Sequence, residues 1–328
     1  MATAEQLRAL LRSYAEGDEP RFLSIAMQIA ALEAKQGHNK LAQELRAVID
    51  EVRTRGKVAP RTPRQPVPLV QPKGELSGLL SVTYPHTRLQ EMVLEEAVRE
   101  RLLRVLREQR QQHKLREHGL RPRNRILLVG PPGSGKTMTA SALAGEMTLP
   151  LFSIQLDGLL TKFMGETAAK LRLVFDAIRT TRGVYFFDEF DSIGGHRAAT
   201  NDVGEIRRVL NSFLQFLEND DSDSLIVAAT NNPQLLDAAL FRRFDDVIEY
   251  RNPTLELAGQ LVSERLGPFR STKLDVRAIV NAFTDLSYAD LARACDDAVK
   301  EAILRDATEV DESAMVSALE ERRSARRS

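Results

Sequence analysis

The most informative part of this 328-residue chain reads ILLVGPPGSGKTMTASALAGEM, residues 126–147. A short apolar run leads into a glycine-rich loop, Gly130–Thr137, and a helical pattern follows the loop. The loop matches G-x-x-x-x-G-K-[ST], in which glycines let backbone N–H groups converge on phosphate oxygens at the amino end of a helix. The sequence therefore predicts a strand, a phosphate-binding loop and a helix, in that order.

Two side chains of this loop have expected roles in nucleotide binding. Lys136 should reach the β- and γ-phosphates, and Thr137 should offer its hydroxyl to Mg²⁺. A glycine-rich turn with a purely structural role would leave this lysine unexplained. The predicted nucleotide-binding residues are Gly130, Pro131, Pro132, Gly133, Ser134, Gly135, Lys136, Thr137 and Met138.

Apolar runs and helical patterns alternate along the middle of the chain. Runs at 126–129, 151–154, 184–187 and 225–229 are each followed by a loop and a helical pattern. This alternation predicts a parallel sheet that helices bury on both faces. Beyond Pro253 only helical patterns remain, and they predict a small all-α domain.

A second chemical signal is VYFFDEFD, residues 184–191, an apolar strand that ends in acids. We expect this strand to lie beside the first one, so that Asp188 points at the phosphate-bound Mg²⁺. Glu189 can polarise a water for attack on the γ-phosphorus. Acids at a strand end can instead cap a helix, but their position after a phosphate loop favours the catalytic interpretation.

Two motifs further along extend the pattern: LIVAATNNP, residues 225–233, and LLDAALFRRFDD, residues 235–246. With them, the stretch from about Ser81 to Leu319 resembles an AAA+ ATPase of the AAA clade, the group that holds protein unfoldases and microtubule-severing enzymes. The resemblance implies an α/β P-loop NTPase fold, in which helices sandwich a parallel sheet, followed by a small all-α lid. It also implies ATP and Mg²⁺ as cofactors and hydrolysis of ATP to ADP and phosphate.

The resemblance assigns roles to individual residues. Asn231 matches the sensor-1 residue, which senses the γ-phosphate. Arg242 and Arg243 match the paired arginine fingers, which act on the ATP of a neighbouring subunit. The implied assembly is a homo-hexamer. No P-G-R insertion precedes the last finger arginine, so the chain is nearest the severing and membrane-sorting branch.

One motif concerns the substrate. The stretch TKFMGE, residues 161–166, matches the aromatic–hydrophobic–glycine pore loop of protein-threading relatives. In a ring, Phe163 and Met164 would project into the channel and grip an extended polypeptide. Alternatively, Phe163 packs inside its own domain. The predicted pore-loop residues are Lys162, Phe163, Met164 and Gly165.

Shifts in composition divide the chain into four predicted parts. Three amphipathic stripes predict a small helical bundle, and a stretch with five prolines and many basic residues predicts an extended linker. The predicted parts are the bundle at 1–55, the linker at 56–80, the large ATPase subdomain at 81–252 and the helical lid at 253–328. We expect the bundle to bind substrate, or a separate adaptor or protease partner.

Composition excludes several classes of protein. Apolar residues make up 43% and charged residues 28%, with 46 basic and 46 acidic side chains, which argues against a disordered, fibrous or generally basic chain. The single cysteine, Cys295, allows no disulfide within the chain and favours a cytoplasmic setting. We see no secretory signal and no apolar run of the ~18 residues that a membrane span needs. Neither H-E-x-x-H nor G-x-S-x-G occurs, so the chain carries no recognisable protease of its own.

The sequence favours a ring-forming ATPase that remodels, unfolds or threads proteins through a central pore. One alternative is a nucleic-acid remodeller such as a loader or helicase, because ten Arg or Lys residues oppose three acids between Arg99 and Arg125. Zero net charge and the pore loop argue against nucleic acid as a partner. Another alternative is an assembly switch, which would not need the complete hydrolysis set that the motifs predict.

Overall fold

A computed structural model describes residues 72, 74–159, 164–191, 203–236, 238–272 and 274–327. The predicted bundle at 1–55 and most of the linker lie outside the described residues, as do Lys162 and Phe163. Residues at the end of the predicted linker are part of the fold: Gly74–Gly78 form a 3-10 helix, η1, and the first strand begins at Leu80.

Within the described residues, six strands form one sheet in the order β1-β3-β4-β5-β2-β6. Neighbouring strands run parallel, except that β1 pairs antiparallel with β3. The mixed sheet confirms the α/β class and the four predicted strands, and it adds β1 and β6, which the sequence did not predict. The strands are β1 (Leu80–Thr83), β2 (Arg125–Val129), β3 (Leu151–Ile154), β4 (Val184–Phe187), β5 (Leu225–Thr230) and β6 (Asp246–Glu249).

The prediction that the strand carrying Asp188 lies beside the first strand is wrong. The strand that carries Asp188 at its end, β4, does not pair with β2, because β5 lies between them. All six residues of β5 are buried, and a strand that is apolar on both faces is stable only at the centre of such a sheet. As a result, Asn231, directly after β5, lies between the phosphate loop and Asp188 at the carboxyl edge of the strands.

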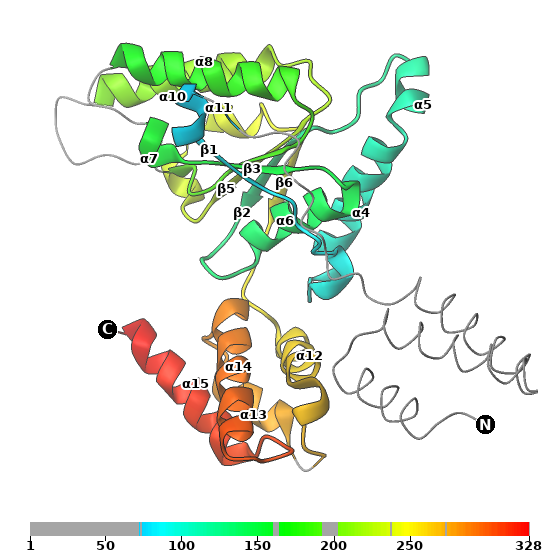
Figure 1. The fold of residues 1–328 in the computed structure, drawn as a ribbon, viewed down its shortest axis with the longest axis vertical. Coiled ribbons are helices and arrows are strands. Elements are labelled where there is room, and N and C mark those ends of the chain that lie inside the picture. The colour runs from blue at the N-terminus through cyan, green and yellow to red at the C-terminus, as the bar shows by residue number, and fades with distance from the viewer. Residues whose placement is uncertain are drawn as a thin grey trace, which may run out of the picture. The chain divides into compact units, whose positions relative to one another are not determined.

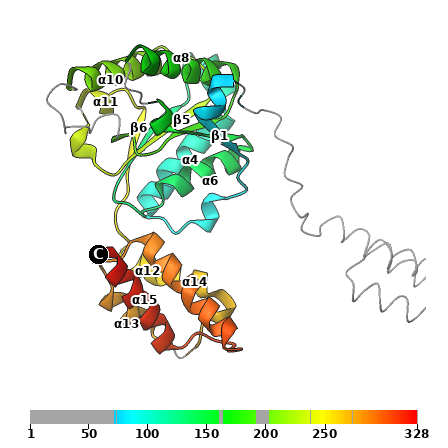
Figure 2. The same cartoon turned by 60° about the vertical axis from the view of Figure 1, so that its left-hand side comes forward.

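Helices cover both faces of the sheet (Figures 1 and 2). On one face, Leu127, Tyr185 and Phe187 pack with α8 and α10, whereas Ile126 and Phe186 on the other face pack with α4 and α6. This split follows from the two-residue alternation of side chains along a strand. The covering helices are α4 (Glu96–Arg110), α6 (Lys136–Met147), α8 (Met164–Thr180) and α10 (Val203–Glu218).

The amphipathic pattern of residues 90–118 predicts one long helix, but the structure divides this stretch into shorter elements. A 3-10 turn, η2 (Leu89–Glu91), precedes α4, and a short α5 (Gln112–Glu117) follows it. Between η2 and α4, the consecutive side chains of Met92, Val93 and Leu94 are all buried. One face of an amphipathic helix cannot bury three consecutive residues, so this segment takes a non-helical path.

The helices after residue 254 pack on one another around a core of their own. Two of them begin with side-chain caps: Thr254 accepts a hydrogen bond from the N–H of Leu257, and Ser287 forms a capping box with Asp290. Cys295 lies in this core, and burial raises the pKa of its thiol to about 12. The remaining elements are α7 (Leu156–Leu159), η3 (Pro233–Leu235), α11 (Ala238–Phe241), α12 (Leu255–Leu266), η4 (Gly267–Phe269), α13 (Val276–Ala282), α14 (Tyr288–Leu304) and α15 (Glu312–Arg327).

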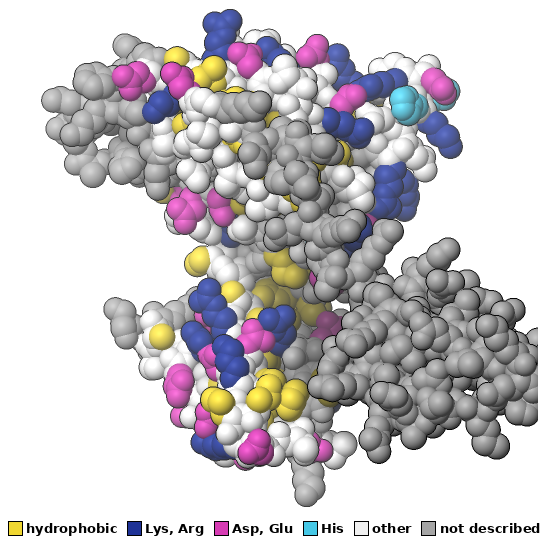
Figure 3. Space-filling view, in the orientation of Figure 1, with side chains coloured by type: hydrophobic (Ala, Val, Ile, Leu, Met, Phe, Trp, Pro, Cys, Tyr) yellow, Lys and Arg dark blue, Asp and Glu magenta, His cyan; other side chains and the backbone are white. Residues whose placement is uncertain are grey.

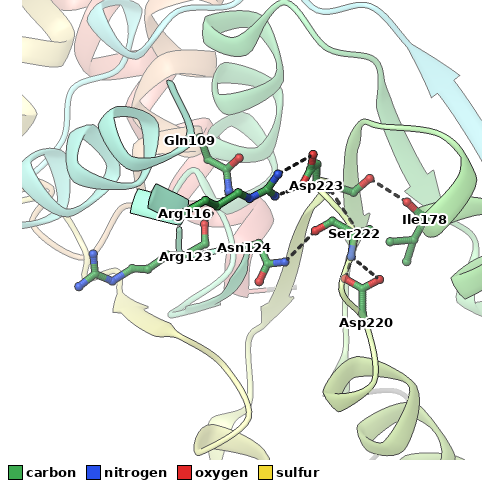
Figure 4. Close-up of polar contacts among 9 residues, drawn as sticks. Gln109, Arg116, Arg123, Asn124, Ile178, Asp220, Ser222 and Asp223 are labelled. Carbon is green, nitrogen blue, oxygen red and sulfur yellow. Dashed lines mark hydrogen bonds and ion pairs between the residues drawn. The ribbon is translucent and has the colours of Figure 1, made fainter. Parts of the chain in front are cut away.

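A polar network holds the amino ends of the central strands together (Figure 4). Arg116 forms an ion pair with Asp223, and Asn124 Nδ2 donates to the carbonyl of Ser222 over 3.3 Å. The hydroxyl of Ser222 donates to Asp220 over 3.0 Å. These contacts link the loop before β2 to the loop before β5.

None of the described helices is long and apolar enough to cross a membrane.

Candidate active site

A pocket of about 530 Å³ lies at the carboxyl edge of the sheet. The phosphate loop, the ends of β4 and β5, the buried segment before α4, and helices α12 and α14 all contribute to it. This volume is in the usual range for small-molecule sites. Its lining residues are Glu91, Met92, Val93, Leu94, Pro132, Gly133, Ser134, Gly135, Lys136, Thr137, Met138, Asp188, Glu189, Asn231, Leu261, Arg265, Tyr288, Ala289, Ala292 and Arg293.

The backbone of the phosphate loop fits an anion such as a nucleotide phosphate. Gly133 and Gly135 have φ values of +75° and +99°, which L side chains rarely adopt. A Cβ on Gly133 would lie 2.5 Å from the Ser287 hydroxyl, so only glycine fits there. No hydrogen bond within the described part of the chain engages the N–H groups of Gly133, Ser134 or Gly135. These donors are available for phosphate oxygens.

Lys136 is buried inside the loop that it belongs to. Its ammonium donates to the carbonyls of Gly130 (2.8 Å) and Pro131 (2.9 Å) and to Asn231 Oδ1 (2.8 Å). Burial lowers the pKa of Lys136, while the nearby carboxylates of Asp188 and Asp191 act in the opposite direction. The structure thus brings the predicted loop lysine and the predicted sensor residue into direct contact.

The predicted metal ligands also meet. Thr137 Oγ1 donates to Asp188 Oδ2 over 3.0 Å, although β5 separates their strands. A hydroxyl beside a carboxylate is the oxygen donor set that suits Mg²⁺. Glu189 is exposed in the pocket with φ = +48°, a left-handed conformation that is uncommon for a residue other than glycine. Such strain is found most often at functional sites.

A carboxylate that the sequence analysis did not single out braces the sensor residue. Asp191 accepts hydrogen bonds from Thr230 Oγ1 (3.0 Å) and Asn232 Nδ2 (2.8 Å). Burial acts to raise the pKa of Asp191, but the hydrogen bonds outweigh it and hold the pKa below its ordinary value. Asn231 lies between these two partners, so Asp191 fixes the turn that presents Asn231 to Lys136.

Helices α12 and α14 form one side of the pocket, and the sequence analysis did not single out the two lining residues of α12. Leu261 and Arg265 come from α12, and Arg265 is held by Asp296 through hydrogen bonds of 2.7 and 2.8 Å. On α14, the N–H of Ala289 donates to the carbonyl of Gly133 over 3.0 Å. The i, i+4 spacing of Leu261 and Arg265 on one helix face was the available signal.

The predicted arginine fingers lie elsewhere. Arg242 and Arg243 follow α11, are exposed, and are not among the residues that line the pocket. Arg243 forms an ion pair with Glu218 at the end of α10. No hydrogen bond or ion pair of Arg242 is found among the described residues. The structure therefore separates these arginines from the nucleotide pocket of their own chain.

Comparison with known proteins identifies the family of this chain. The family model for the ATPase family associated with various cellular activities (AAA) matches residues 126–252. An uncharacterized AAA family ATPase of Sinorhizobium fredii, y4kL, is 33% identical over 98% of this chain and 96% of its own length. The chain belongs to the AAA ATPase family. This AAA protein is therefore an ATPase, and ATP is its nucleotide.

Other relatives of this AAA ATPase are longer proteins. The peroxisomal ATPase pex6 of Schizosaccharomyces pombe is 37% identical over 59% of this chain, but only 22% of pex6 is covered. The ATP-dependent zinc metalloprotease FtsH 2 of Bdellovibrio bacteriovorus is 33% identical over 76% of this chain and 43% of its own length. The chain thus spans less than half of these two relatives.

A second recess, of about 950 Å³, lies at the opposite, amino-terminal edge of the sheet in this AAA ATPase. It is larger than the nucleotide pocket but includes no residue of the phosphate loop. Its charged groups largely neutralise one another, as in the ion pairs Arg116–Asp223 and Arg123–Glu108. Chemistry, and not volume, therefore identifies the pocket at the carboxyl edge as the candidate active site.

Proposed function

We propose that this AAA ATPase forms a homo-hexameric ring and hydrolyses ATP to remodel, unfold or thread protein substrates through a central pore. The main support is the position of Arg242 and Arg243, which are exposed and outside the pocket that holds Lys136, Asp188 and Asn231. Arginines that complete a hydrolysis site can be supplied by another chain. An assembly in which each subunit completes the next site accounts for this separation.

Within each site we assign separate roles to the chain's own groups. Lys136 and the free N–H groups of the loop bind the β- and γ-phosphates, and Thr137 with Asp188 holds Mg²⁺. Asn231, held against Lys136, contacts the γ-phosphate. Glu189 accepts a proton from the attacking water, because its carboxylate is exposed to the pocket next to Asp188. Mg²⁺, when bound, neutralises charge that develops on the phosphates.

Two observations support protein as the substrate class. The Bdellovibrio relative is an ATP-dependent zinc metalloprotease, so the region it shares with this chain occurs there in a protein that acts on proteins. In addition, the segment TKFMGE matches an aromatic pore loop, and Met164 and Gly165 of this segment begin α8.

Residues 1–55 would bind substrate, or a separate adaptor or protease partner. A buried thiol at Cys295 fits a reducing cytoplasm.

The structure gives little support to nucleic acid as the substrate. Six of the ten basic residues between Arg99 and Arg125 already have partners in the chain, and Figure 3 shows acidic and basic side chains interspersed on the described part of one face. A binding stripe for phosphates needs basic groups that are free and clustered. The engaged pairs are Arg99 with the Met92 carbonyl, Arg101 with Asp246, Arg110 with Glu146, Arg116 with Asp223, Arg123 with Glu108 and Arg125 with the Asp220 carbonyl.

Replacing Phe163 by alanine should separate ATP hydrolysis from work on proteins. The ring supplies apolar contact that tolerates any substrate sequence, so its loss weakens the grip without touching the nucleotide pocket. We expect basal ATPase within about twofold of the parent, because the predicted role of Phe163 is to contact the substrate and not the nucleotide. We also expect little stimulation by an unfolded polypeptide and no unfolding of a tagged reporter protein.

The matched control is Phe163→Tyr, which keeps an aromatic ring and should keep stimulation. A melting curve of each variant tests the alternative that Phe163 is a core residue. A large fall in melting temperature for Phe163→Ala would support that alternative and remove Phe163 from the pore. Stimulation by single-stranded DNA or RNA that is equal in parent and variant would favour the nucleic-acid remodeller instead.

A further inference from the structure

Tyr250 connects three parts of the molecule that the motifs describe separately. It is the first residue after β6, and its N–H donates to the carbonyl of Val129 over 2.7 Å. A Cβ on Gly130 would lie 2.4 Å from the carbonyl oxygen of Tyr250, so the loop begins in close contact with this residue. The backbone of Tyr250 therefore supports the first residue of the phosphate loop.

The side chain of Tyr250 reaches the last part of the same loop. Its hydroxyl lies 2.6 Å from Thr139 Oγ1, and both residues are buried, with exposed fractions of 4% and 0%. Thr139 Oγ1 in turn donates to the carbonyl of Gly135 over 3.0 Å. Because the threonine has one hydroxyl proton, it accepts from Tyr250, and the chain of bonds runs from Tyr250 through Thr139 to Gly135.

The protonation state of the phenol agrees with this direction. Burial raises the pKa of Tyr250, although its bond to Thr139 opposes the shift. The group stays protonated at physiological pH and can act as a donor. Buried hydroxyl networks of this kind fix geometry when every member is satisfied.

The residues that follow Tyr250 lead directly into α12. A cavity of about 100 Å³ is bordered by Tyr250, by Asn252 and Thr254 of the connecting segment, by Ser134 of the loop and by Tyr288 of α14. This cavity lies where the loop, the connecting segment and α14 meet. The chain of bonds from Tyr250 through Thr139 to Gly135 joins the connecting segment to the loop at this junction.

We propose that Tyr250 is a positioning residue for nucleotide binding: it holds both ends of the phosphate loop and ties them to the 251–254 segment that precedes α12. No motif of the phosphate loop includes Tyr250 or requires a hydroxyl at Thr139. Tyr250 does not line the pocket of about 530 Å³, so we expect it to act on the nucleotide through Gly130, Thr139 and Gly135.

The experiment measures ADP affinity by titration calorimetry in the full-length protein, with Mg²⁺ present. Tyr250→Phe removes only the hydroxyl and should weaken ADP binding about 3- to 10-fold, the effect of one lost buried hydrogen bond. Thr139→Val should weaken ADP binding at least as much. Thr139→Ser, which keeps the hydroxyl, should bind ADP with parental affinity. The double variant Tyr250→Phe with Thr139→Val should bind no more weakly than Thr139→Val alone, because both remove the same link.

The matched control is Tyr185→Phe. Tyr185 is also fully buried, and its hydroxyl lies 2.9 Å from the carbonyls of Ala177 and Thr181, close to the amino end of β4. This variant loses a buried hydroxyl bond far from the nucleotide pocket. It should lower the melting temperature about as much as Tyr250→Phe and leave ADP affinity unchanged.

Steady-state kinetics give a readout that general destabilisation would not move. We expect Tyr250→Phe to raise the KM for ATP by the same factor as the dissociation constant, with kcat within about twofold of the parent. Hydrogen exchange supplies the second arm: ADP should slow exchange at residues 251–254 in the parent, and less so in Tyr250→Phe.

Three results would overturn the proposal. ADP affinity could be unchanged in Tyr250→Phe, or Tyr185→Phe could weaken it to the same extent. ADP could also leave exchange at 251–254 unaffected in the parent, which would remove the link to α12. If Tyr250→Phe does not fold, the comparison of Thr139→Val with Thr139→Ser still decides, because equal affinities would contradict the proposed chain of bonds.

Discussion

Replacing Lys136 by alanine will remove nucleotide binding over the usual range of concentrations. Lys136 supplies the positive charge of the phosphate loop. Its buried ammonium is held by two carbonyls of the loop and by Asn231. Loss of a buried charged partner costs about 2–5 kcal/mol, which corresponds to a roughly 30- to 4,000-fold weaker complex. Titration with ATP or ADP measures this change directly.

Replacing Glu189 by glutamine will give the opposite combination of properties. The variant should bind ATP with parental affinity and lose hydrolysis by roughly 10²- to 10⁴-fold, the usual contribution of a general base. Glu301→Gln, which alters an acid of α14 that pairs with Arg305 and does not line the pocket, is the matched control and should keep full activity. Normal turnover in Glu189→Gln would exclude Glu189 as the base.

Replacing Arg242 or Arg243 by alanine will leave ATP binding intact and lower hydrolysis by about 10³-fold if these residues act as arginine fingers. They lie outside the pocket of their own chain, so the loss should arise at sites formed between subunits. ATPase activity per subunit should also fall on dilution. The matched control is Arg305→Ala, which removes an exposed arginine that pairs with Glu301 on α14 and its cap.

A mixing experiment tests the trans mechanism. Lys136→Ala subunits keep their arginines, and Arg242→Ala subunits keep their nucleotide pocket. Mixed rings should therefore contain some complete sites and recover part of the activity that each variant lacks alone. Constant activity per subunit down to a proven monomer would rule out fingers supplied by a neighbour.

Much of the sheet could be predicted because its strands carry a local signal. The buried runs at 126–129, 184–187 and 225–229 are apolar at every position, which marks central strands. The edge strands β1 and β6 are four residues each and mix polar with apolar side chains. Their strand conformation depends on hydrogen bonds to distant partners, so no short window of sequence distinguishes them from loops.

The order of the strands in the sheet also could not be predicted from the sequence pattern. Helical crossovers fix which strands run parallel, but several orders satisfy the same alternation of elements. We placed the strand of Asp188 next to the first strand, whereas β5 takes that position. The contact between Thr137 and Asp188 forms all the same, because side chains at one edge of a sheet can reach across an intervening strand.

Parts of the site depend on residues that are far apart in the sequence. Thr139 and Tyr250 are 111 positions apart, and neither belongs to a recognisable motif. Asp191 is partly an exception, because it is the last residue of the acidic motif at 184–191, which also contains Asp188 and Glu189. Its role became clear only when Thr230 and Asn232 were placed beside it. Motifs thus indicated the groups that we propose to contact phosphate, and the fold identified the groups that hold them.

The position of β2 in the sheet has a consequence for how the protein is made. Its two partners, β5 and β6, pair through Val227 and Asp246 with Ile126, so they emerge about 100 and 120 positions later in the chain. At ribosomal rates of about 5–20 residues per second, a nascent chain waits roughly 6 to 24 s between β2 and β6. Until β5 emerges, this apolar strand has no partner on either side, and until β6 emerges one of its edges stays unpaired. We therefore expect newly synthesised chains to need protection from aggregation until Tyr250 has left the ribosome, a demand that ATP cannot relieve, because its site does not yet exist.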